Sequence, residues 1–345
     1  MLKDKKNITI YDIAREAGVS ASLVSRVISG NGSVSEKNRM KIQKLIDKYN
    51  FRPNAIARGL QKSRSRMIGF VLPHISTEYF SSTYYEFEKR ASKAGYMTIL
   101  CNGKSDPEVE SKILRTLEET RVEAIIFMGG RADLIGVEDE YIDELRKVNK
   151  SIPCIVCSSR AEMFDCIGIH GDDYIGVNKL MAHLAQQGYK SLAILGGTDQ
   201  SHPSKVKKQY FKEAAIRYGM EIRNEWIIGN SFNPEDGAEA MKQLLKQSHI
   251  PEVACCINDH VAVGAINVAL DAGLVIPDDI AITGYDGVEA SILSRPHITT
   301  VCPNYSEYGE TIFQAMTALM EGREFEKLTL IEPEIIIRSS SLRYK

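Results

Sequence analysis

The stretch ITIYDIAREAGVSASLVSRVI, residues 8–28, decides the architecture of the N-terminal part of the chain. Thr9 with Asp12 three residues later predicts the start of a helix, and Gly18 predicts its end. Ser20 is suited to cap a second helix after a tight turn. Because apolar residues recur at helical spacing in both segments, the pattern predicts a helix-turn-helix.

The second helix of this pattern has two different faces. Val24, Val27 and Ile28 face inward, and the opposite face carries short polar groups and one arginine: Ala21, Ser22, Ser25, Arg26 and Ser29. Such a face is suited to enter the major groove of DNA. The alternative is a plain three-helix bundle with a solvated basic surface.

Charge distribution favours the DNA-binding interpretation. Residues 1–66 hold 15 Lys and Arg against 5 Asp and Glu, a net charge of +10. The rest of the chain holds 28 basic and 40 acidic residues, a net charge of −12. An overall charge of −2 therefore hides a strong asymmetry, which is typical of a contact with nucleic acid at one end.

Beyond residue 66, short apolar runs alternate with stretches of helical period. The strands expected from these runs are 67–72, 96–101, 124–128, 153–157, 191–195, 253–257 and 280–283. The amphipathic helices expected between them include 84–94, 107–120, 174–187, 206–218 and 261–272. Such alternation predicts parallel sheets covered by helices on both faces. Ligands of open parallel sheets bind at the carboxyl ends of the strands, so functional residues are expected there.

Several classes of protein are disfavoured by the sequence. No run of about 18 apolar residues could span a bilayer, and no export signal is found, so a cytoplasmic location is expected. The seven cysteines are odd in number and irregularly spaced, which favours reduced thiols. Cys154 and Cys157 would face opposite sides of a strand, and no histidine pattern of a zinc site occurs, so neither a metal nor a cofactor is expected. No motif of nucleophilic or paired-acid catalysis is present, so an enzyme is not expected.

The motifs in segments 8–20 and 23–28, together with RPNAIARGL at 52–60, resemble the lactose/galactose repressor (LacI) family of bacterial transcription regulators. The resemblance continues through IGFVLP at 68–73 and TTV at 299–301. It implies a homodimer that binds a near-palindromic operator, and a core of two doubly wound parallel-sheet lobes of periplasmic-binding-protein type that senses a small molecule. The expected divisions are a helix-turn-helix domain at 1–52, a hinge helix and linker at 53–66, and a core at 67–345, with an N-lobe at 67–162 and 297–325 and a C-lobe at 163–294 and 326–343.

The resemblance also implies DNA contacts. Ala21, Ser22 and Arg26 occupy base-reading positions of the family. Its phosphate-contacting positions correspond to Tyr11, Ser20, Ser25, Ser33 and Ser35. Segment 54–60 matches the hinge helix, which in the family folds on cognate DNA and inserts a leucine into the minor groove; its DNA-contacting residues here would be Asn54, Ala57 and Leu60. A helix of this length containing Gly59 is too short to form alone, so its order should depend on DNA.

For the effector, the resemblance points to residues after several strands. Its aromatic positions correspond to Tyr79, Phe80, Phe232 and Tyr305, and its hydroxyl-binding positions to Asn258 and Asp286. Two positions depart from the family pattern: Lys207 replaces a sugar-binding arginine, and Ser158 replaces an aspartate. Lysine lacks the planar two-pronged contact of arginine. A sugar-like effector is expected, and a phosphorylated sugar, an oligosaccharide, a non-sugar effector and a phosphoprotein co-regulator all remain open.

Three other functions fit parts of the sequence. A solute-binding protein would need only the α/β core, and a sugar-active enzyme could use Asp286 and Asp259 as acid and base. A catabolite-type regulator would answer to a phosphorylated carrier protein. The basic headpiece favours a DNA-binding repressor, and the short polar end of the chain, without a heptad helix, favours a dimer over a tetramer.

Overall fold

The computed structural model describes residues 8–29, 33–51 and 65–343. The chain divides into two compact units, Met1–Ser65 and Arg66–Lys345, which are called the headpiece and the core below.

The headpiece contains the predicted helix-turn-helix. Its helices are α1 (Ile10–Ala17), α2 (Ala21–Ser29) and α3 (Glu36–Lys48). The capping box at the start of α1 is formed, with the Asp12 amide donating to the Thr9 hydroxyl at 3.3 Å. Gly18 ends α1 in the left-handed conformation, at φ 66°, which explains a glycine there. The hydroxyl of Ser20 accepts the Leu23 amide at 3.3 Å.

A small apolar core holds the three helices together. Its fully buried members are Ile13, Ala14, Ala17, Val24 and Ile42, and Val27 and Ile28 pack partly buried against them. The carboxylate of Glu16 on α1 accepts Lys48 Nζ at 2.7 Å and the Tyr49 hydroxyl at 2.6 Å. These contacts join α1 to the end of α3, so the turn between α1 and α2 is held from both sides.

The first lobe of the core is a six-stranded sheet in the order β11-β5-β4-β3-β1-β2, parallel throughout. Its strands are β1 (Met67–Leu72), β2 (Met97–Asn102), β3 (Ala124–Met128), β4 (Cys154–Cys157), β5 (Ile167–Gly171) and β11 (Leu328–Ile331). Apolar side chains of α5 (Glu78–Lys93) and α13 (Tyr305–Met320) cover one face. The other face packs against α6 (Pro107–Thr120) and α7 (Asp139–Asn149). Burial on both faces explains the unbroken apolar run of β1.

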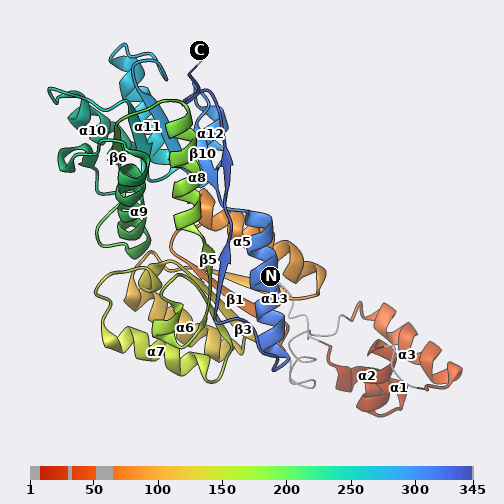
Figure 1. Cartoon of the computed structure of the whole chain (residues 1–345). Coiled ribbons are helices and arrows are strands. Elements are labelled where there is room, and N and C mark those ends of the chain that lie inside the picture. The colour runs from red at the N-terminus through yellow and green to blue at the C-terminus, as the bar shows by residue number, and fades with distance from the viewer. Residues whose placement is uncertain (1–7, 30–32, 52–64, 344–345) are drawn as a thin grey trace, which may run out of the picture. The chain divides into compact units, whose positions relative to one another are not determined.

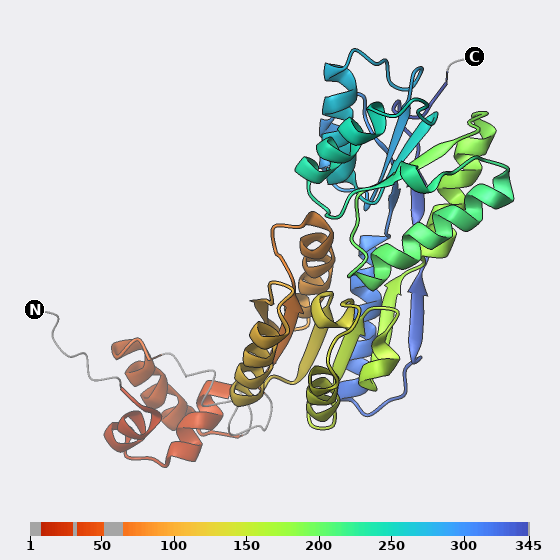
Figure 2. The same cartoon turned by 90° about the vertical axis from the view of Figure 1, so that its left-hand side faces the viewer.

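The second lobe repeats this plan around a sheet in the order β12-β10-β9-β8-β6-β7. Its strands are β6 (Leu192–Leu195), β7 (Ile227–Ile228), β8 (Val253–Cys256), β9 (Ala281–Tyr285), β10 (Thr299–Cys302) and the antiparallel β12 (Glu334–Ile336). One face packs against α8 (Asp173–Gln186) and α9 (His202–Tyr218). The other packs against α10 (Pro234–Leu245) and α11 (Asp259–Asp271), with α12 (Ala290–Leu293) beside α11. Figures 1 and 2 show the two sheets in separate lobes.

The lobe boundaries expected from the sequence are wrong at three strands. β5 and β11 belong to the first sheet although both were assigned to the C-lobe, and β10 belongs to the second sheet although it was assigned to the N-lobe. The chain therefore passes between the sheets after β5, after β10 and after β11. The pairing of β11 with β5 joins residues about 160 positions apart, whereas β5 pairs with the preceding strand β4 and β10 with the preceding strand β9. The apolar pattern of a strand does not report which sheet it joins.

The cysteines behave as small apolar side chains. Cys154 and Cys157 lie on opposite faces of β4 and pack into different apolar clusters, as their spacing predicts. Cys255 and Cys256 are likewise buried on the two faces of β8. Burial raises the pKa of Cys157 and Cys255 to about 12, so both thiols are protonated and unreactive at neutral pH.

Candidate functional site

The expected base-reading face of α2 is open at two positions. Ser22 and Arg26 are exposed, and they lie four residues apart on the same face of the helix. Ala21 and Ser25 are only half-buried, and Ala21 packs partly against the headpiece core. Ser22 and Arg26 are therefore the most exposed side chains of the face expected to read bases.

Most of the side chains expected to contact phosphates are exposed. Tyr11 is 67% exposed at the first turn of α1. Ser20, Ser33 and Ser35 are also exposed, and the Ser35 side chain forms no capping bond to α3 although it stands at the cap position. Asn54, Ala57 and Leu60 of the expected hinge helix lie outside the described residues.

The second lobe contributes a cluster of charged and aromatic side chains, Lys207, Asp173 and Tyr285, to the junction of the lobes. Lys207 Nζ on α9 lies 3.6 Å from Asp173 Oδ1 and 3.5 Å from the centroid of the Tyr285 ring. The Tyr285 hydroxyl donates to the same Asp173 oxygen at 2.7 Å. Lys207 is therefore paired within its own lobe rather than free to bind a ligand as the arginine of the family pattern would.

Asp286 follows β9 directly and faces the first lobe. Its backbone carbonyl accepts the hydroxyl of Tyr305 at 2.7 Å, and the Tyr305 ring lies 6.2 Å from that of Tyr79. Burial raises the pKa of Asp286 to about 6. The positive charge of Lys207 lowers this pKa and offsets part of the shift, whereas the negative charge of Asp173 raises it further. Asp286 adopts φ 94°, a conformation that few residues tolerate, which is typical of functional loops.

Tyr79 lies where the two lobes meet. Burial raises its pKa well above the usual value, and the negative charges of Asp286, Asp173 and Asp133 add to the shift. Asp286 belongs to the second lobe, Asp173 follows a crossing between the lobes, and Asp133 belongs to the first lobe. Phe80 packs edge-on against Tyr79, with ring centroids 5.2 Å apart, and joins the apolar core of the first lobe.

Asn258 and Phe232 form a separate pair at the edge of the second lobe. Asn258 caps α11 by accepting the Val261 amide at 2.8 Å, and its side-chain nitrogen donates to the Phe232 carbonyl at 3.0 Å. One end of the amide thus caps α11 and the other holds the segment before α10. Phe232 itself is 42% exposed, as a stacking residue needs to be.

Ser158 stands beside a carboxylate that the sequence did not single out. Its hydroxyl donates to the Ala132 carbonyl at 3.4 Å. A hydrogen bond with the Ser158 side chain also lowers the pKa of Asp133. Burial nevertheless raises the Asp133 pKa to about 6. Asp133 Oδ1 is buried and has no hydrogen-bond partner within the described residues.

A backbone bridge ties the Asp133 segment to the other lobe. The Asp133 carbonyl accepts the His202 amide at 2.7 Å, and the Ile135 amide donates to the Gln200 carbonyl at 2.8 Å. Leu134 and Ser201 form an isolated antiparallel bridge between them. Backbone hydrogen bonds therefore join the two lobes at this point.

A buried ion network fixes the turn that precedes Asp133. Arg131 is fully buried, and its guanidinium donates to Glu110 at 2.9 Å and to Glu144 at 2.8 Å. It also donates to the Pro107 carbonyl at 2.6 Å and to the Ser111 hydroxyl at 2.8 Å. With so many fixed donors, Arg131 holds the turn Gly130–Ala132 and positions the neighbouring Asp133.

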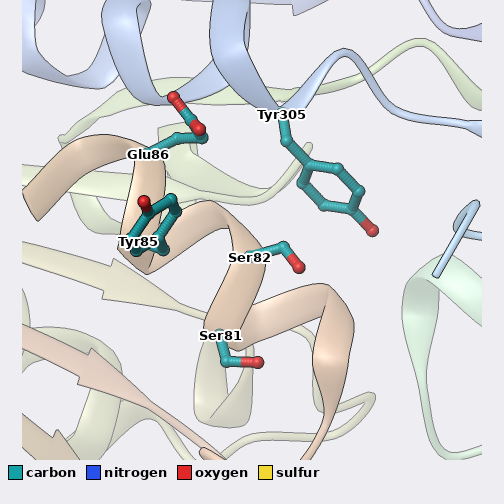
Figure 3. A pocket seen from close by; sticks show the side chains of 5 residues that line it. All are labelled: Ser81, Ser82, Tyr85, Glu86 and Tyr305. Carbon is teal, nitrogen blue, oxygen red and sulfur yellow. The ribbon is translucent and has the colours of Figure 1, made fainter. Parts of the chain in front are cut away.

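A hollow of about 340 Å³ lies on the outer side of this junction. It is lined by Ser81, Ser82, Tyr85, Glu86 and Tyr305. In Figure 3 the first four project from α5, and Tyr305 extends from the start of α13 beside them. Tyr305 thus has one side toward this hollow and its hydroxyl on the Asp286 segment.

Three residues of this site were missed by the sequence reasoning. Asp133 follows β3, and Tyr285 ends β9 immediately before Asp286. Asp173 follows β5, a strand that was not predicted. The rule that ligands gather at the carboxyl ends of strands would have found Asp133 and Tyr285 if applied to every residue there.

Two features are absent from the residues that the structure describes. Within residues 8–29, 33–51 and 65–343, no three His, Cys, Asp or Glu side chains are grouped so as to hold a metal ion. In the same part of the chain no helix is long and apolar enough to cross a membrane.

Comparison with known proteins identifies the class. Residues 9–54 match the model of the bacterial regulatory proteins of the lacI family. Residues 65–338 match the model of periplasmic binding proteins and the sugar binding domain of the LacI family. The chain therefore belongs to the LacI family of DNA-binding transcription regulators.

Individual relatives agree with this assignment. The chain is 31% identical over 317 residues to catabolite control protein A of Priestia megaterium, covering 91% of this chain and 93% of that protein. It is 30% identical to the HTH-type transcriptional repressor PurR of Mannheimia succiniciproducens, covering 96% and 98%.

Solved structures share the fold. The Lac repressor dimer bound to operator and the anti-inducer ONPF matches with a TM-score of 0.85 at 23% identity, covering 98% of this chain and all of that one. The transcriptional regulator CelR in complex with cellobiose matches with a TM-score of 0.70 at 19% identity, covering 96% and 99%.

Proposed function

We propose that this protein is a homodimeric repressor that binds a near-palindromic operator and whose DNA affinity depends on an effector held between the two lobes. The proposal that the protein binds DNA rests on the face of α2, where Ser22 and Arg26 are exposed on a segment with a net charge of +10. Arg26 is the base-reading group, because arginine can make a two-pronged contact with guanine in the major groove. Bacterial operators are chromosomal, so the protein acts in the cytoplasm.

Around this face, Tyr11, Ser20, Ser25, Ser33 and Ser35 bind phosphates and set the position of the headpiece on DNA. Ala21 lies against the bases. Asn54, Ala57 and Leu60 contact the minor groove when operator is bound. These roles extend the family pattern to this chain residue by residue.

The proposal that an effector binds between the lobes rests on residues that both lobes contribute. Tyr79 and Asp133 come from the first lobe, Asp286 and Tyr285 from the second, and Asp173 and Tyr305 from crossings between them. A molecule bound among these groups contacts both lobes and favours one arrangement of the backbone bridge at Leu134 and Ser201. Its preference for one arrangement sets the change in operator affinity, as linkage requires.

A second candidate has one specific observation in its favour. Several of the related sequences are catabolite control proteins, including the one from Priestia megaterium. A protein co-regulator could therefore act on this chain in addition to, or instead of, a small molecule.

Catalysis has little support from the site. Asp259, which could have served with Asp286 as an acid–base pair, is fully buried. Its Oδ2 accepts the Val288 amide at 2.9 Å, and burial raises its pKa well above the usual value. A carboxyl group without access to solvent or substrate holds the loop after β9 and does not transfer protons to a bound sugar.

The direct test is selection of DNA by the purified full-length protein from a random library. We expect enrichment of a near-palindromic site, because a two-fold symmetric dimer binds two matching half-sites. Enrichment of single half-sites would refute the dimer, and the absence of any enrichment would refute the regulator. Arg26→Ala should weaken the enrichment and relax the base preference, while Arg15→Ala at an exposed position on α1 should leave both unchanged.

A further inference from the structure

Two of the seven cysteines lie side by side in the first lobe. β4 and β5 pair in parallel, with Ile155 opposite Ile167. One step back along this register, Cys154 at the start of β4 stands opposite Cys166, which directly precedes β5. Residues at matching positions of adjacent parallel strands project to the same face of the sheet, and both cysteines pack into the same apolar cluster. The two free thiols therefore face each other across one strand pairing.

The side chain of Asn149, at the end of α7, fixes this arrangement. Its Oδ1 accepts the amide of Cys154 at 2.8 Å, and its Nδ2 donates to the carbonyl of Asp165 at 2.7 Å. Because Asp165 directly precedes Cys166, one side-chain amide holds the backbone of both cysteine-bearing segments. The two thiols also interact, since a hydrogen bond with Cys166 is the largest cause that raises the pKa of Cys154, and burial comes next.

The spacing that the sheet imposes suits a covalent link between these two sulfur atoms. Neighbouring strands lie about 4.7–4.9 Å apart, and the Cα atoms of disulfide-linked cysteines lie about 4.4–6.8 Å apart. Other close pairs in the sequence lack this geometry. Cys154 and Cys157 lie on opposite faces of β4, and Cys255 and Cys256 lie on opposite faces of β8, so neither pair can be linked while its strand is intact.

The two thiols differ in their access to solvent. Cys154 is 1% exposed and Cys166 is 7% exposed. Cys166 follows directly on Asp165, an exposed residue in the left-handed backbone conformation at φ 53°. The raised pKa of Cys154 keeps that thiol protonated at neutral pH, so it is a poor first nucleophile. Cys166 is therefore the thiol that a small oxidant meets first, and Cys154 stands behind it as the second.

We propose that Cys154 and Cys166 form a modification site that closes to an internal disulfide when the protein meets hydrogen peroxide. The Cys166 sulfur attacks one peroxide oxygen, the O–O bond breaks, and the other oxygen leaves as water with the thiol proton, which gives a sulfenic acid. The Cys154 sulfur then attacks the Cys166 sulfur and displaces the hydroxyl group, which leaves as a second water with the Cys154 proton. Two thiols are oxidised, one peroxide is reduced, and the link fastens β4 to β5. This inference goes beyond the proposed function and does not depend on it.

The experiment is peptide mapping of the reduced full-length protein after treatment with hydrogen peroxide at neutral pH. Catalase removes the excess peroxide, and N-ethylmaleimide blocks the remaining thiols under denaturing conditions. We expect two fewer blocked thiols than in the untreated protein and a peptide that links residues 154 and 166, both reversed by dithiothreitol. A link between other cysteines, or oxidation of Cys166 to a sulfinic acid without a link, overturns the proposal. So does a protein that keeps all seven thiols under conditions that fully oxidise free glutathione.

Matched variants assign the link. Cys154→Ala and Cys166→Ala should each abolish it, whereas Cys157→Ala, on the opposite face of β4, should keep it. Alanine is chosen because it places no unpaired hydroxyl in the apolar cluster. A disulfide that still forms in either of the first two variants belongs to other cysteines and overturns the proposal.

A stability measurement needs no variant. The peroxide-treated protein should melt about 4 °C or more above the reduced protein, because the cross-link restricts the unfolded chain. Differential scanning calorimetry of the two forms measures the shift in Tm. An unchanged or lower Tm of the linked form would show that the strands do not accommodate the bond, which also overturns the proposal.

Discussion

The headpiece and the core differ in how their functional residues are brought together. In the headpiece, Ser22 and Arg26 lie on one helix, and their exposure follows from the apolar spacing of Val24, Val27 and Ile28. In the core, Asp133 of the first lobe and His202 of the second lobe are about 70 residues apart in the chain and are joined by a backbone hydrogen bond of 2.7 Å. A site on one helix can be recognised from a local pattern, whereas a site between lobes depends on long-range pairing.

The largest effect is expected in the core, at the buried ion network of Arg131, Glu110 and Glu144. Arg131→Leu should destabilise the core by about 3–5 kcal/mol, because it leaves Glu110 buried without its partner. Chemical denaturation of the full-length protein measures the loss, and the headpiece should be unaffected. The control is Arg115→Leu, an exposed residue 3.9 Å from the same Glu144, which should change stability by no more than about 0.5 kcal/mol. Similar losses for the two variants would contradict a special role for Arg131.

The matching test in the headpiece acts on DNA binding alone. Arg26→Ala should weaken binding to the cognate operator by about 1–3 kcal/mol and relax the base preference, because a base contact is lost. Fluorescence anisotropy on operator and random DNA measures both effects. Lys62→Ala, in the basic stretch QKSRSR at 61–66, should weaken binding to all sequences alike, because it removes a positive charge that attracts phosphates. Equal losses on operator and random DNA for Arg26→Ala would remove its role as a base reader.

The third prediction uses the raised pKa of Asp286. Its folded-state pKa is about 6 and its ordinary value is 3.8, so between about pH 4 and pH 6 the folded chain holds more protons than the unfolded chain. The contribution of Asp286 to the free energy of unfolding therefore falls as pH rises through this window. Asp286→Asn should remove that fall and stabilise the protein at pH 7 by roughly 1–2 kcal/mol, after allowance for solvent screening. Calorimetry of both proteins from pH 4 to pH 7 measures it, and parallel profiles would show that the carboxyl is not desolvated.

The smallest effect is expected at the helix cap of the headpiece. Thr9→Ala should destabilise the headpiece by about 1 kcal/mol, because the Asp12 amide loses its acceptor. Thr9→Ser should restore most of the stability, since the hydroxyl is kept. Amide exchange in the first turn of α1 reports the change, and no difference between the alanine and serine variants would mean that the cap contributes little.

Several elements were predictable because their signals are local. The strands 67–72 and 124–128 and the helix 107–120 match β1, β3 and α6. Continuous apolar runs mark strands buried on both faces, and Asp106 before Pro107 marks a helix start. The missed strands β5 and β11 have weaker patterns, because β5 contains two glycines and a histidine and β11 is a half-exposed edge strand.

The sequence by itself determined the helix-turn-helix, the charge of the headpiece and the alternation of strands and helices, because each depends on neighbours within a few turns of chain. Only the tertiary structure decided that β5 and β11 pair with the first sheet and β10 with the second. It also decided that Lys207 pairs with Asp173 and lies over the Tyr285 ring. Which charges are compensated depends on distances of a few ångströms between residues far apart in the chain, and burial then sets how strongly each uncompensated charge favours a ligand.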